Sequence, residues 1–307
     1  MTQYIIRRLL QMIPIAFGIL TLVFSLIHLI PGDPAVQIAG ESARPEDVIA
    51  VRKSLGLDQP LWSQYVSYLT HVLRGDLGKS FQTNESVTVQ IRQRYPATMQ
   101  LAFGAMLIAL AIAFPLGIIS AIYRGSWIDN LARVFALIGV SMPSFALGPL
   151  LIIFFAIDHT WFPVSGRDEG LKSLVLPSLT MGLALAAILT RMIRTSLADE
   201  LTQLYVTTAV AKGVTRGKAI FRHALKNALI PVITVVALQF GSLLTGAIIT
   251  EQIFSWPGLG RLLLQSISTR DYPQVQASIL VIALTYIFVN FASDLLYGVV
   301  DPRIKLQ

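Results

Sequence analysis

Cysteine is absent from all 307 residues of the sequence. Its absence excludes disulfide bonds, thiolate metal sites and cysteine nucleophiles. Histidine is rare too, and the four histidines are scattered without the spacing of metal ligands. They are His28, His71, His159 and His223. We therefore expect no metal site in this chain.

Charged residues are scarce as well. Asp, Glu, Lys and Arg make up 13% of the chain, whereas soluble domains contain ~25%. The mean hydropathy is +0.66, so an integral membrane protein is expected. Six apolar segments approach or exceed the ~20 residues that a helix needs to cross the hydrocarbon core. They are about 9–30, 97–122, 134–157, 174–196, 229–250 and 276–299.

Backbone polar groups in lipid need internal partners, so these segments predict an all-α integral membrane fold with six transmembrane helices. The fourth segment is the weakest, because it contains a proline and several small residues. The first follows Arg7 and Arg8, as a signal peptide would. Its apolar run is too long for that, and no clear cleavage site follows, so we predict a retained span.

Acidic residues are few on one predicted side of the membrane. With the N-terminus inside, the inside segments carry 13 Lys or Arg against 4 acids, and the outside segments 11 against 12. Lys and Arg in short segments mark the cytoplasmic side. We therefore predict that both termini are cytoplasmic.

The long segment 31–96 is then predicted to be an extracytoplasmic insertion. Residues 45–57 and 59–75 each read as a short amphipathic helix, from a first-turn acid, a terminal glycine and an apolar face. We therefore divide the chain into residues 1–96, with the first span and the insertion, and 97–307, with a five-helix core.

Catalytic motifs were not found. GDLGKS (75–80) looks like part of a phosphate-binding loop, but the pattern needs a glycine where Leu73 stands and a strand before it. Neither G-x-S-x-G nor H-E-x-x-H occurs. We therefore expect no catalytic residue, no enzyme activity and no cofactor in this chain.

Polar and small residues interrupt two of the spans. Gly241 belongs to a row of small residues, which suits close helix packing or a pore lining. Asn290 and Asp294 form a polar stripe on the last helix. A membrane aspartate suggests function, although one this near the inside end is equally well explained as paired or snorkelled. These three are candidate pathway or interface residues.

The stretch 205–231 is basic, yet it lies between two apolar spans. We predict one helix ending at Gly213 and a second beginning after Thr215, which can cap it. In the second helix Lys218, Arg222 and Lys226 form a basic stripe. The opposing apolar face comprises Ile220, Phe221, Ala224, Leu225 and Ala228. A nucleic-acid reader, a membrane-surface helix and a handle for another protein all fit this pattern, but a DNA reader held so close to two spans could hardly reach a groove.

This stretch resembles the cytoplasmic coupling loop of ABC importer permeases, whose pattern is E-A-A, three residues and then Gly. Thr207, Thr208 and Ala209 take the E-A-A places, and Gly213 takes the glycine. His223 and Leu225 take places in the later I-x-L-P, where Lys226 replaces the proline. TAVAKG and HALKNALIP are similar to the dipeptide/oligopeptide/nickel branch of the family. So are LIPGDPA, LGLDQPLWSQY, RGDLGKS, SMPSFALG, FSWPGLGR, RDYP and DLLYGVVDPRI, which cover nearly the whole chain.

The resemblance implies a type I importer. A second homologous permease would complete the pathway, two cytoplasmic ATPases would bind ATP and Mg, and an extracytoplasmic binding protein would deliver the solute. The loop, about 199–228, would contact an ATPase with its apolar face in a groove and its basic rim paired with acids. The implied contact residues are Thr207, Thr208, Ala209, Lys212, Gly213, Arg222, His223 and Leu225.

The solute is less well defined. Short peptides are favoured because the spans hold no cluster of histidines or carboxylates for a metal. Glutathione and nickel chelates occur in the same branch and stay open. An ion-coupled secondary transporter is the alternative from another class, but such carriers need acids near mid-bilayer. We expect a multi-pass protein of the bacterial inner membrane.

Overall fold

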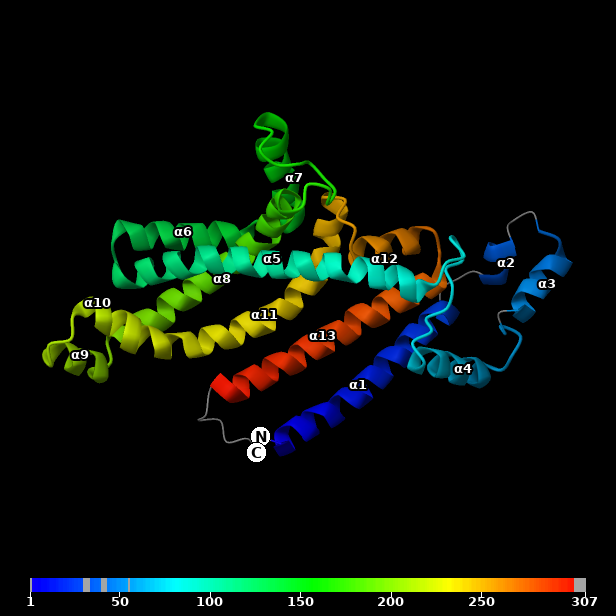
Figure 1. Ribbon diagram of the computed structural model, residues 1–307, viewed down its shortest axis with the longest axis horizontal. Coiled ribbons are helices and arrows are strands. Elements are labelled where there is room, and N and C mark those ends of the chain that lie inside the picture. Colours follow the sequence, from blue (N-terminus) through cyan, green and yellow to red (C-terminus); the bar gives the residue numbers. More distant parts are fainter. Residues whose placement is uncertain (1, 30–33, 40–42, 55, 301–307) are drawn as a thin grey trace.

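The computed structural model describes residues 2–29, 34–39, 43–54 and 56–300. In this part of the chain the regular structure is helical, apart from one isolated antiparallel bridge between Lys79 and Ser86. The long helices run side by side, most of the short helices lie towards the two ends of the bundle, and α7 projects from its side (Figure 1). The predicted all-α membrane fold is confirmed.

Five helical segments are long and apolar enough to cross a membrane. They match the first, second, fourth, fifth and sixth predicted spans. The segments are Ile5–Ser25 within α1 (Thr2–Leu29), α5 (Val87–Ile122), α8 (Leu171–Leu201), Arg216–Ile253 and Tyr272–Leu296 within α13 (Tyr272–Val300). The fourth of these joins α10 (Arg216–Lys218), the π-type helix η2 (Ala219–Ala224) and α11 (Leu225–Ile253).

The third predicted span, about 134–157, is broken and is not one continuous helix. It consists of α6 (Trp127–Ser141) followed by α7 (Ser144–Leu151) and the π-type η1 (Ile152–Asp158), and the two parts meet at 106°. Pro143 explains the break. Proline disfavours helical geometry at the preceding residue, and Met142 is extended (φ −85°, ψ 116°). Counted as one bent span, the pair gives six crossings.

The fourth predicted span, expected to be the weakest, is instead the central helix of the bundle. In α8 67% of the most apolar window is buried inside the chain, against 6% in the first span. Small residues allow this burial, because they let neighbouring backbones approach. A Cβ added at Gly182 would lie 2.7 Å from the carbonyl oxygen of Ala105 on α5. The helix continues through Pro177, which is itself buried.

The two ends of the bundle differ. One end, which we call the loop end, carries α9 (Leu204–Ala211), α10 and the turn between α5 and α6 (Figure 1). The other, the far end, carries α2 (Pro34–Ala39), α3 (Pro45–Ser54), α4 (Leu61–Leu73) and α12 (Leu259–Ser268). The helical insertion after the first span is thus present, and α3 and α4 lie where two amphipathic helices were predicted.

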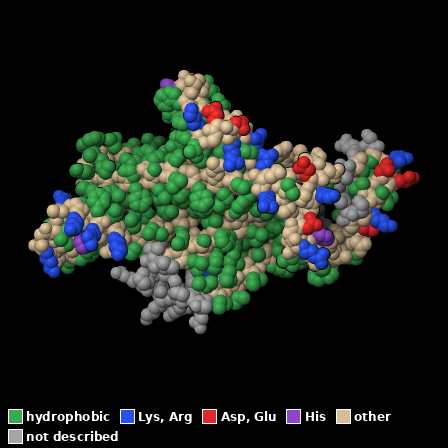
Figure 2. Space-filling model, in the orientation of Figure 1, with side chains coloured by type: hydrophobic (Ala, Val, Ile, Leu, Met, Phe, Trp, Pro, Cys, Tyr) green, Lys and Arg blue, Asp and Glu red, His purple; other side chains and the backbone are tan. Residues whose placement is uncertain are grey.

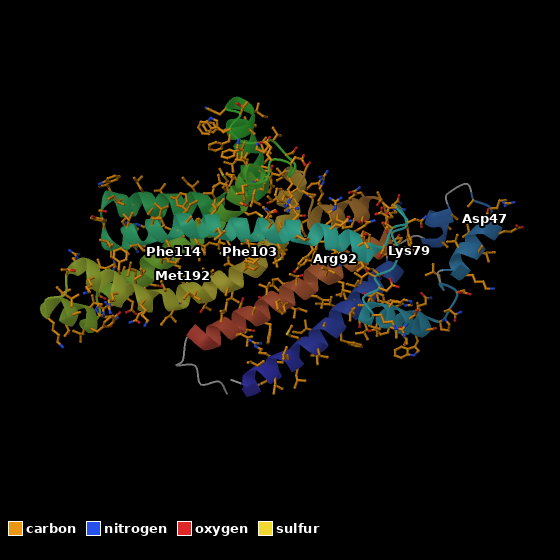
Figure 3. All side chains as sticks on the ribbon, in the orientation of Figure 1. Asp47, Lys79, Arg92, Phe103, Phe114 and Met192 are labelled. Atoms are coloured by element: carbon orange, nitrogen blue, oxygen red, sulfur yellow. The ribbon has the colours of Figure 1, made fainter. Side chains whose placement is uncertain are left out.

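Charged side chains gather at these ends and in the connection between η1 and α8, where Arg167, Asp168 and Glu169 are exposed (Figure 2). Hydrophobic side chains cover the middle of the visible face, and Lys and Arg gather over the loop end (Figure 2). Asp47, Lys79 and Arg92 belong to the far end, whereas Phe103 and Phe114 lie along the middle of the bundle (Figure 3). This distribution suits a molecule whose central band lies in lipid.

Candidate functional site

The first helix of the basic loop ends just before Gly213, as predicted. It does not continue from about residue 199, because Thr202 and Gln203 separate it from α8. α9 ends at Ala211, and Gly213 follows in the left-handed region at φ +90°. The N–H of Gly213 donates to the carbonyl of Val210 (2.9 Å), and that of Val214 to Ala209 (3.1 Å), which closes the helix end. An added Cβ at Gly213 would have no atom within 4 Å. The glycine is therefore required by its backbone conformation and not by lack of space.

The second helix begins after Thr215 and continues without a break into the fifth span. Thr215 occupies the N-cap position, but its side chain makes no capping hydrogen bond. The π-type turn η2 changes which side chains share a face, because it widens the helix locally. Phe221, predicted to lie on the apolar face beside Ile220, is 60% exposed. Ile220 is buried, so the two residues do not share one face of the helix as predicted.

The apolar face of this helix packs on the chain itself. Buried small and aliphatic residues form a cluster that we call the loop cluster, which consists of Ala121, Leu197, Ala198, Val206, Ala219, Ala224 and Ala228. Leu225 packs against it and is half-buried. The expectation that this face fills a groove in another protein does not hold, because α5, α8 and α9 already cover it.

The loop also carries apolar and basic residues that are exposed. The apolar residues include Leu204, Tyr205, Val210 and Phe221, and the cations include Lys212, Lys218 and Arg222. We call these seven residues the loop surface. Thr207 and Thr208 are exposed, and both hydroxyls donate to the carbonyl of Leu204 (2.9 and 2.7 Å). Ala209 and His223 are half-buried.

Tyr205 joins three helices and was not singled out from the sequence. Its hydroxyl donates to the carboxylate of Glu200 at the end of α8 and accepts from the side-chain amide of Asn227 on α11 (3.0 Å). Partial burial, and then the hydrogen bond to Glu200, raise the pKa of Tyr205. The two hydrogen bonds of the hydroxyl hold the start of α9 in place. Nothing in the sequence around Tyr205 indicates these hydrogen bonds to Glu200 and Asn227.

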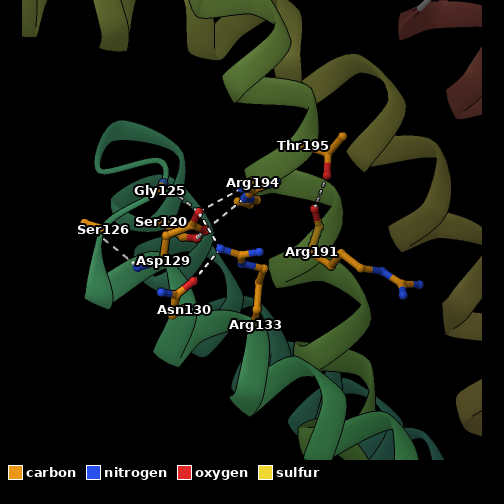
Figure 4. Close-up of polar contacts among 9 residues, drawn as sticks. All are labelled: Ser120, Gly125, Ser126, Asp129, Asn130, Arg133, Arg191, Arg194 and Thr195. Atoms are coloured by element: carbon orange, nitrogen blue, oxygen red, sulfur yellow. Dashed lines mark hydrogen bonds and ion pairs between the residues drawn. The ribbon is translucent and has the colours of Figure 1, made fainter.

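A buried carboxylate ties the α5–α6 turn to α8 at the same end (Figure 4). Asp129 is fully buried and accepts two hydrogen bonds from Arg194, from Nε to Oδ1 (3.0 Å) and from Nη2 to Oδ2 (2.8 Å). The hydroxyl of Ser120 (2.6 Å) and the backbone N–H of Gly125 (2.9 Å) donate to the same carboxylate. Asp129 and Arg194 were counted among the charges of the inside segments, but their pairing was not predicted from the sequence. Their proximity depends on how α6 packs on α8.

At the far end a second buried carboxylate organises the motif FSWPGLGR (254–261). Glu251 accepts from the hydroxyl of Thr98 (2.6 Å) and from the backbone N–H of Arg261 (2.9 Å), and Thr98 in turn accepts from the N–H of Leu259 (2.8 Å). The start of α12 is thus capped by side chains of α5 and α11. A Cβ added at Gly258 would lie 2.1 Å from Oε1 of Glu251, which explains a glycine there.

Asp271 joins two more of the family-like motifs. Its carboxylate accepts from the hydroxyl of Ser80 and from the N–H of Phe81 (3.1 Å), so RGDLGKS is held against RDYP. GDLGKS is a turn with no strand before it among the described residues. This geometry supports the interpretation that it is not a phosphate-binding loop.

The candidate pathway residues come together beside one cavity. A space of about 1020 Å³ lies among α1, α11, α12 and α13, and Asn290 and Asp294 line it. Gly241 lies next to it, since an added Cβ would be 3.0 Å from the Tyr286 ring and 3.5 Å from Oδ1 of Asn290. Asp294 forms an ion pair with Arg8 (2.9 Å). The alternative of a paired aspartate is therefore confirmed, while a role in the pathway stays a prediction.

Known proteins resemble this chain over its full length. Residues 113–306 match the family described as binding-protein-dependent transport system inner membrane component, and residues 1–102 match its N-terminal counterpart. The glutathione transport system permease proteins GsiC of Salmonella typhimurium (strain LT2) and Escherichia coli (strain K12) are each 43% identical over 307 residues, which is 100% of both chains.

Solved structures of importer subunits share the fold. A chain of the inward-facing MetNI methionine ABC transporter aligns with a TM-score of 0.57 at 19% identity, covering 69% of this chain and 96% of that chain. A chain of an amino acid ABC transporter crystallised with histidines gives a TM-score of 0.55 at 14% identity, covering 68% and 94%. At these identities the likeness concerns the fold alone.

Proposed function

The chain belongs to the family of binding-protein-dependent transport system inner membrane components, and from this premise we propose that it forms half of the pathway through which an ABC importer takes up short peptides. As a permease of the peptide/nickel branch, it is a multi-pass inner-membrane protein. A permease without an ATPase site of its own depends on partner subunits for energy.

Glutathione is the first solute to test. The observation that carries the proposal is the 43% identity over the whole chain to permeases named for glutathione transport. Glutathione is a tripeptide, so it falls in the class of short peptides that the sequence favours. The candidate pathway supports an organic solute, because Asp294, the carboxylate that lines the cavity, is already paired with Arg8.

The loop surface is the proposed contact with the ATPase subunits. Exposed Leu204 and Phe221 offer apolar anchors, and Lys218 and Arg222 offer a basic border for acidic residues of a partner. The ATPases would bind ATP and Mg, and ATP-driven closure would favour one arrangement of the permeases through these contacts. The loop end would then be cytoplasmic and the far end would receive the binding protein.

A second homologous permease is the proposed neighbour within the membrane. Only 6% of the apolar window of the first span and 11% of that of α13 are buried inside this chain. Six crossings from one chain supply one side of a pathway, and the rest must come from another bundle. Gly241, Asn290 and Asp294 are the residues we propose near that pathway.

Uptake into proteoliposomes tests the proposal. The complete complex would be reconstituted with its binding protein outside and ATP inside, and labelled glutathione, a dipeptide and a nickel chelate would be offered separately. We expect glutathione or dipeptide to accumulate only when both ATP and the binding protein are present. Uptake that needs a proton gradient and no ATPase would overturn the importer mechanism, and uptake of the nickel chelate alone would overturn the solute class.

A further inference from the structure

We propose that the ion pair between Asp129 and Arg194 makes α6 move together with the coupling loop, so that both are positioning residues of the transport cycle. The inference rests on the proposed function, because it concerns how movement of the loop reaches the rest of the permease. Neither residue belongs to the loop surface.

The pair shares its supporting helices with the loop cluster. Ser120 of α5 donates to Asp129, and the next residue, Ala121, packs in the loop cluster. Arg194 of α8 holds the same carboxylate, and Leu197, about one turn further on, packs in the cluster as well. The same turns of α5 and α8 therefore touch the loop on one side and Asp129 on the other.

α6 depends on these helices for its connection to the loop. It packs chiefly on α8 and α5, and shares no substantial packing with α9, α10 or η2 in the described part of the chain. A second close contact lies further along, where a Cβ added at Gly139 would be 2.7 Å from the Cβ of Ala187. Residues 129 and 139 are ten positions apart on the helix, or about 15 Å. Two attachments fix the direction of α6 on α8, whereas one would let it pivot.

Movement of α6 would be passed to α7 and from there to the end of α11. After the bend at Pro143, Gly148 of α7 packs against Ile253 and Phe254, at 3.2 and 3.3 Å from an added Cβ. The N–H of Gly166 also donates to the carbonyl of Phe254 (2.9 Å). α6 therefore links the loop end to the motif that positions α12 at the far end.

The chemistry of the pair suits this role. Arginine presents a planar fork of donors that grips both carboxylate oxygens and so fixes an angle as well as a distance. Lysine keeps the charge but cannot grip both oxygens in that fixed geometry. Arg133 provides a matched control, because it approaches the same carboxylate at 3.5 Å yet is 56% exposed.

The first experiment compares solute transported with ATP hydrolysed in the reconstituted complex, for Asp129→Asn, Arg194→Met, Arg194→Lys and Arg133→Met. We expect the first two to lower the solute moved per ATP about tenfold, in the range found for residues of coupled networks, with hydrolysis near the wild-type rate. Arg194→Lys should be intermediate and Arg133→Met close to wild type. Unchanged transport, or transport and hydrolysis that fall in parallel, would overturn the proposal.

The second experiment measures a distance in a complex whose ion pair is intact, and again in Arg194→Lys. The chain has no cysteine, so spin labels at Leu137→Cys on α6 and Gly217→Cys in the loop report one distance. Gly217 is exposed and lies outside the seven residues of the loop surface. We expect that distance to be the same with and without ATP, and to broaden in Arg194→Lys. An ATP-dependent change in the wild-type pair would overturn the proposal even if Asp129→Asn failed to assemble. The distance measurement does not require that the solute be known. If the wild-type complex took up none of the solutes offered, that result would count against the proposed function and not against the role of the ion pair.

Discussion

Several residues at the loop end set the backbone conformation of the loop and do not themselves form the exposed surface. Gly213 has φ +90° and no neighbour that a side chain would meet. Thr207 and Thr208 bond to their own helix, and the half-buried Leu225 supports the loop cluster from within. Of the residues carried over from the family pattern, Lys212 and Arg222 are the ones that the structure places on the loop surface.

Gly213→Val should weaken coupling without harming the membrane spans. A β-branched residue in the left-handed region costs about 1–2 kcal/mol, and the strain would be relieved by turning α10 away from α9. We expect normal membrane insertion, weaker association with the ATPases and lower transport, measured by pull-down and uptake. Gly213→Asn is the matched control, because asparagine tolerates this backbone conformation. Equal behaviour of both variants would argue against a role for the positive φ.

Phe221→Asp and Leu225→Asp should differ in their effect on the thermal stability of the permease. Phe221 is exposed, so a charge there should weaken ATPase association and leave the thermal stability of the permease unchanged. Leu225 packs against the loop cluster, so a charge there should lower that stability as well, through an unpaired polar group in an apolar site. Lys218→Ala should be milder than either, because exposed ion pairs contribute about 0–1 kcal/mol. Pull-down and a thermal melt of each purified variant would separate the two effects.

Gly258→Ala should destabilise the far end. The added methyl would overlap the carboxylate of Glu251, which cannot retreat without losing its bonds to Thr98 and Arg261. We expect a lower melting temperature for the purified permease. Gly246→Ala is the control, since the atom nearest to its added Cβ is 4.0 Å away and alanine favours a helix by about 1 kcal/mol over glycine. A melting temperature unchanged in Gly258→Ala would mean that the Glu251 network adds little.

At the scale of whole elements, apolar length predicted the spans well and missed their breaks. The five uninterrupted spans were found because ~20 apolar residues suffice to define a membrane helix. The bend at Pro143 was missed although proline marks it, because the apolar run continues on both sides. Pro177 was judged the more serious interruption, yet α8 continues through it and is the most buried span. A proline shows where a helix can break, and tertiary packing decides whether it does.

The faces of the loop helix were harder to predict than its ends. Gly213 was recognisable because glycine ends helices by a known backbone geometry. The π-type turn over Ala219–Ala224 left no comparable mark in the sequence, so a regular helical period placed Phe221 on the wrong face. The pairs Asp129–Arg194 and Glu251–Thr98 join residues that are far apart in the chain or carried by different helices. No spacing rule could have brought them together.

At the scale of the whole molecule, the number of crossings predicts on which side of the membrane the two termini lie. α5 ends at the loop end, whereas α8 begins away from that end, beside α7 (Figure 1). Counting the bent pair between them as one crossing gives a total of six. An even number places the start of α1 and the end of α13 on the same side of the membrane, which is that of the loop end. From the exposed Lys and Arg of the loop end we predict that this side is cytoplasmic.

Cysteines introduced one at a time into this cysteine-free chain can test that arrangement. Ser63 of α4 is exposed at the far end, and Gly217 of α10 is exposed at the loop end. In intact cells, with the outer membrane made permeable, a membrane-impermeant maleimide should label Ser63→Cys and not Gly217→Cys. After the inner membrane is opened, both should react, which controls for accessibility of the thiol itself. Labelling of Gly217→Cys in intact cells would place the loop surface outside, where no ATP-driven partner could reach it, and the coupling role proposed for the loop would fail with the topology.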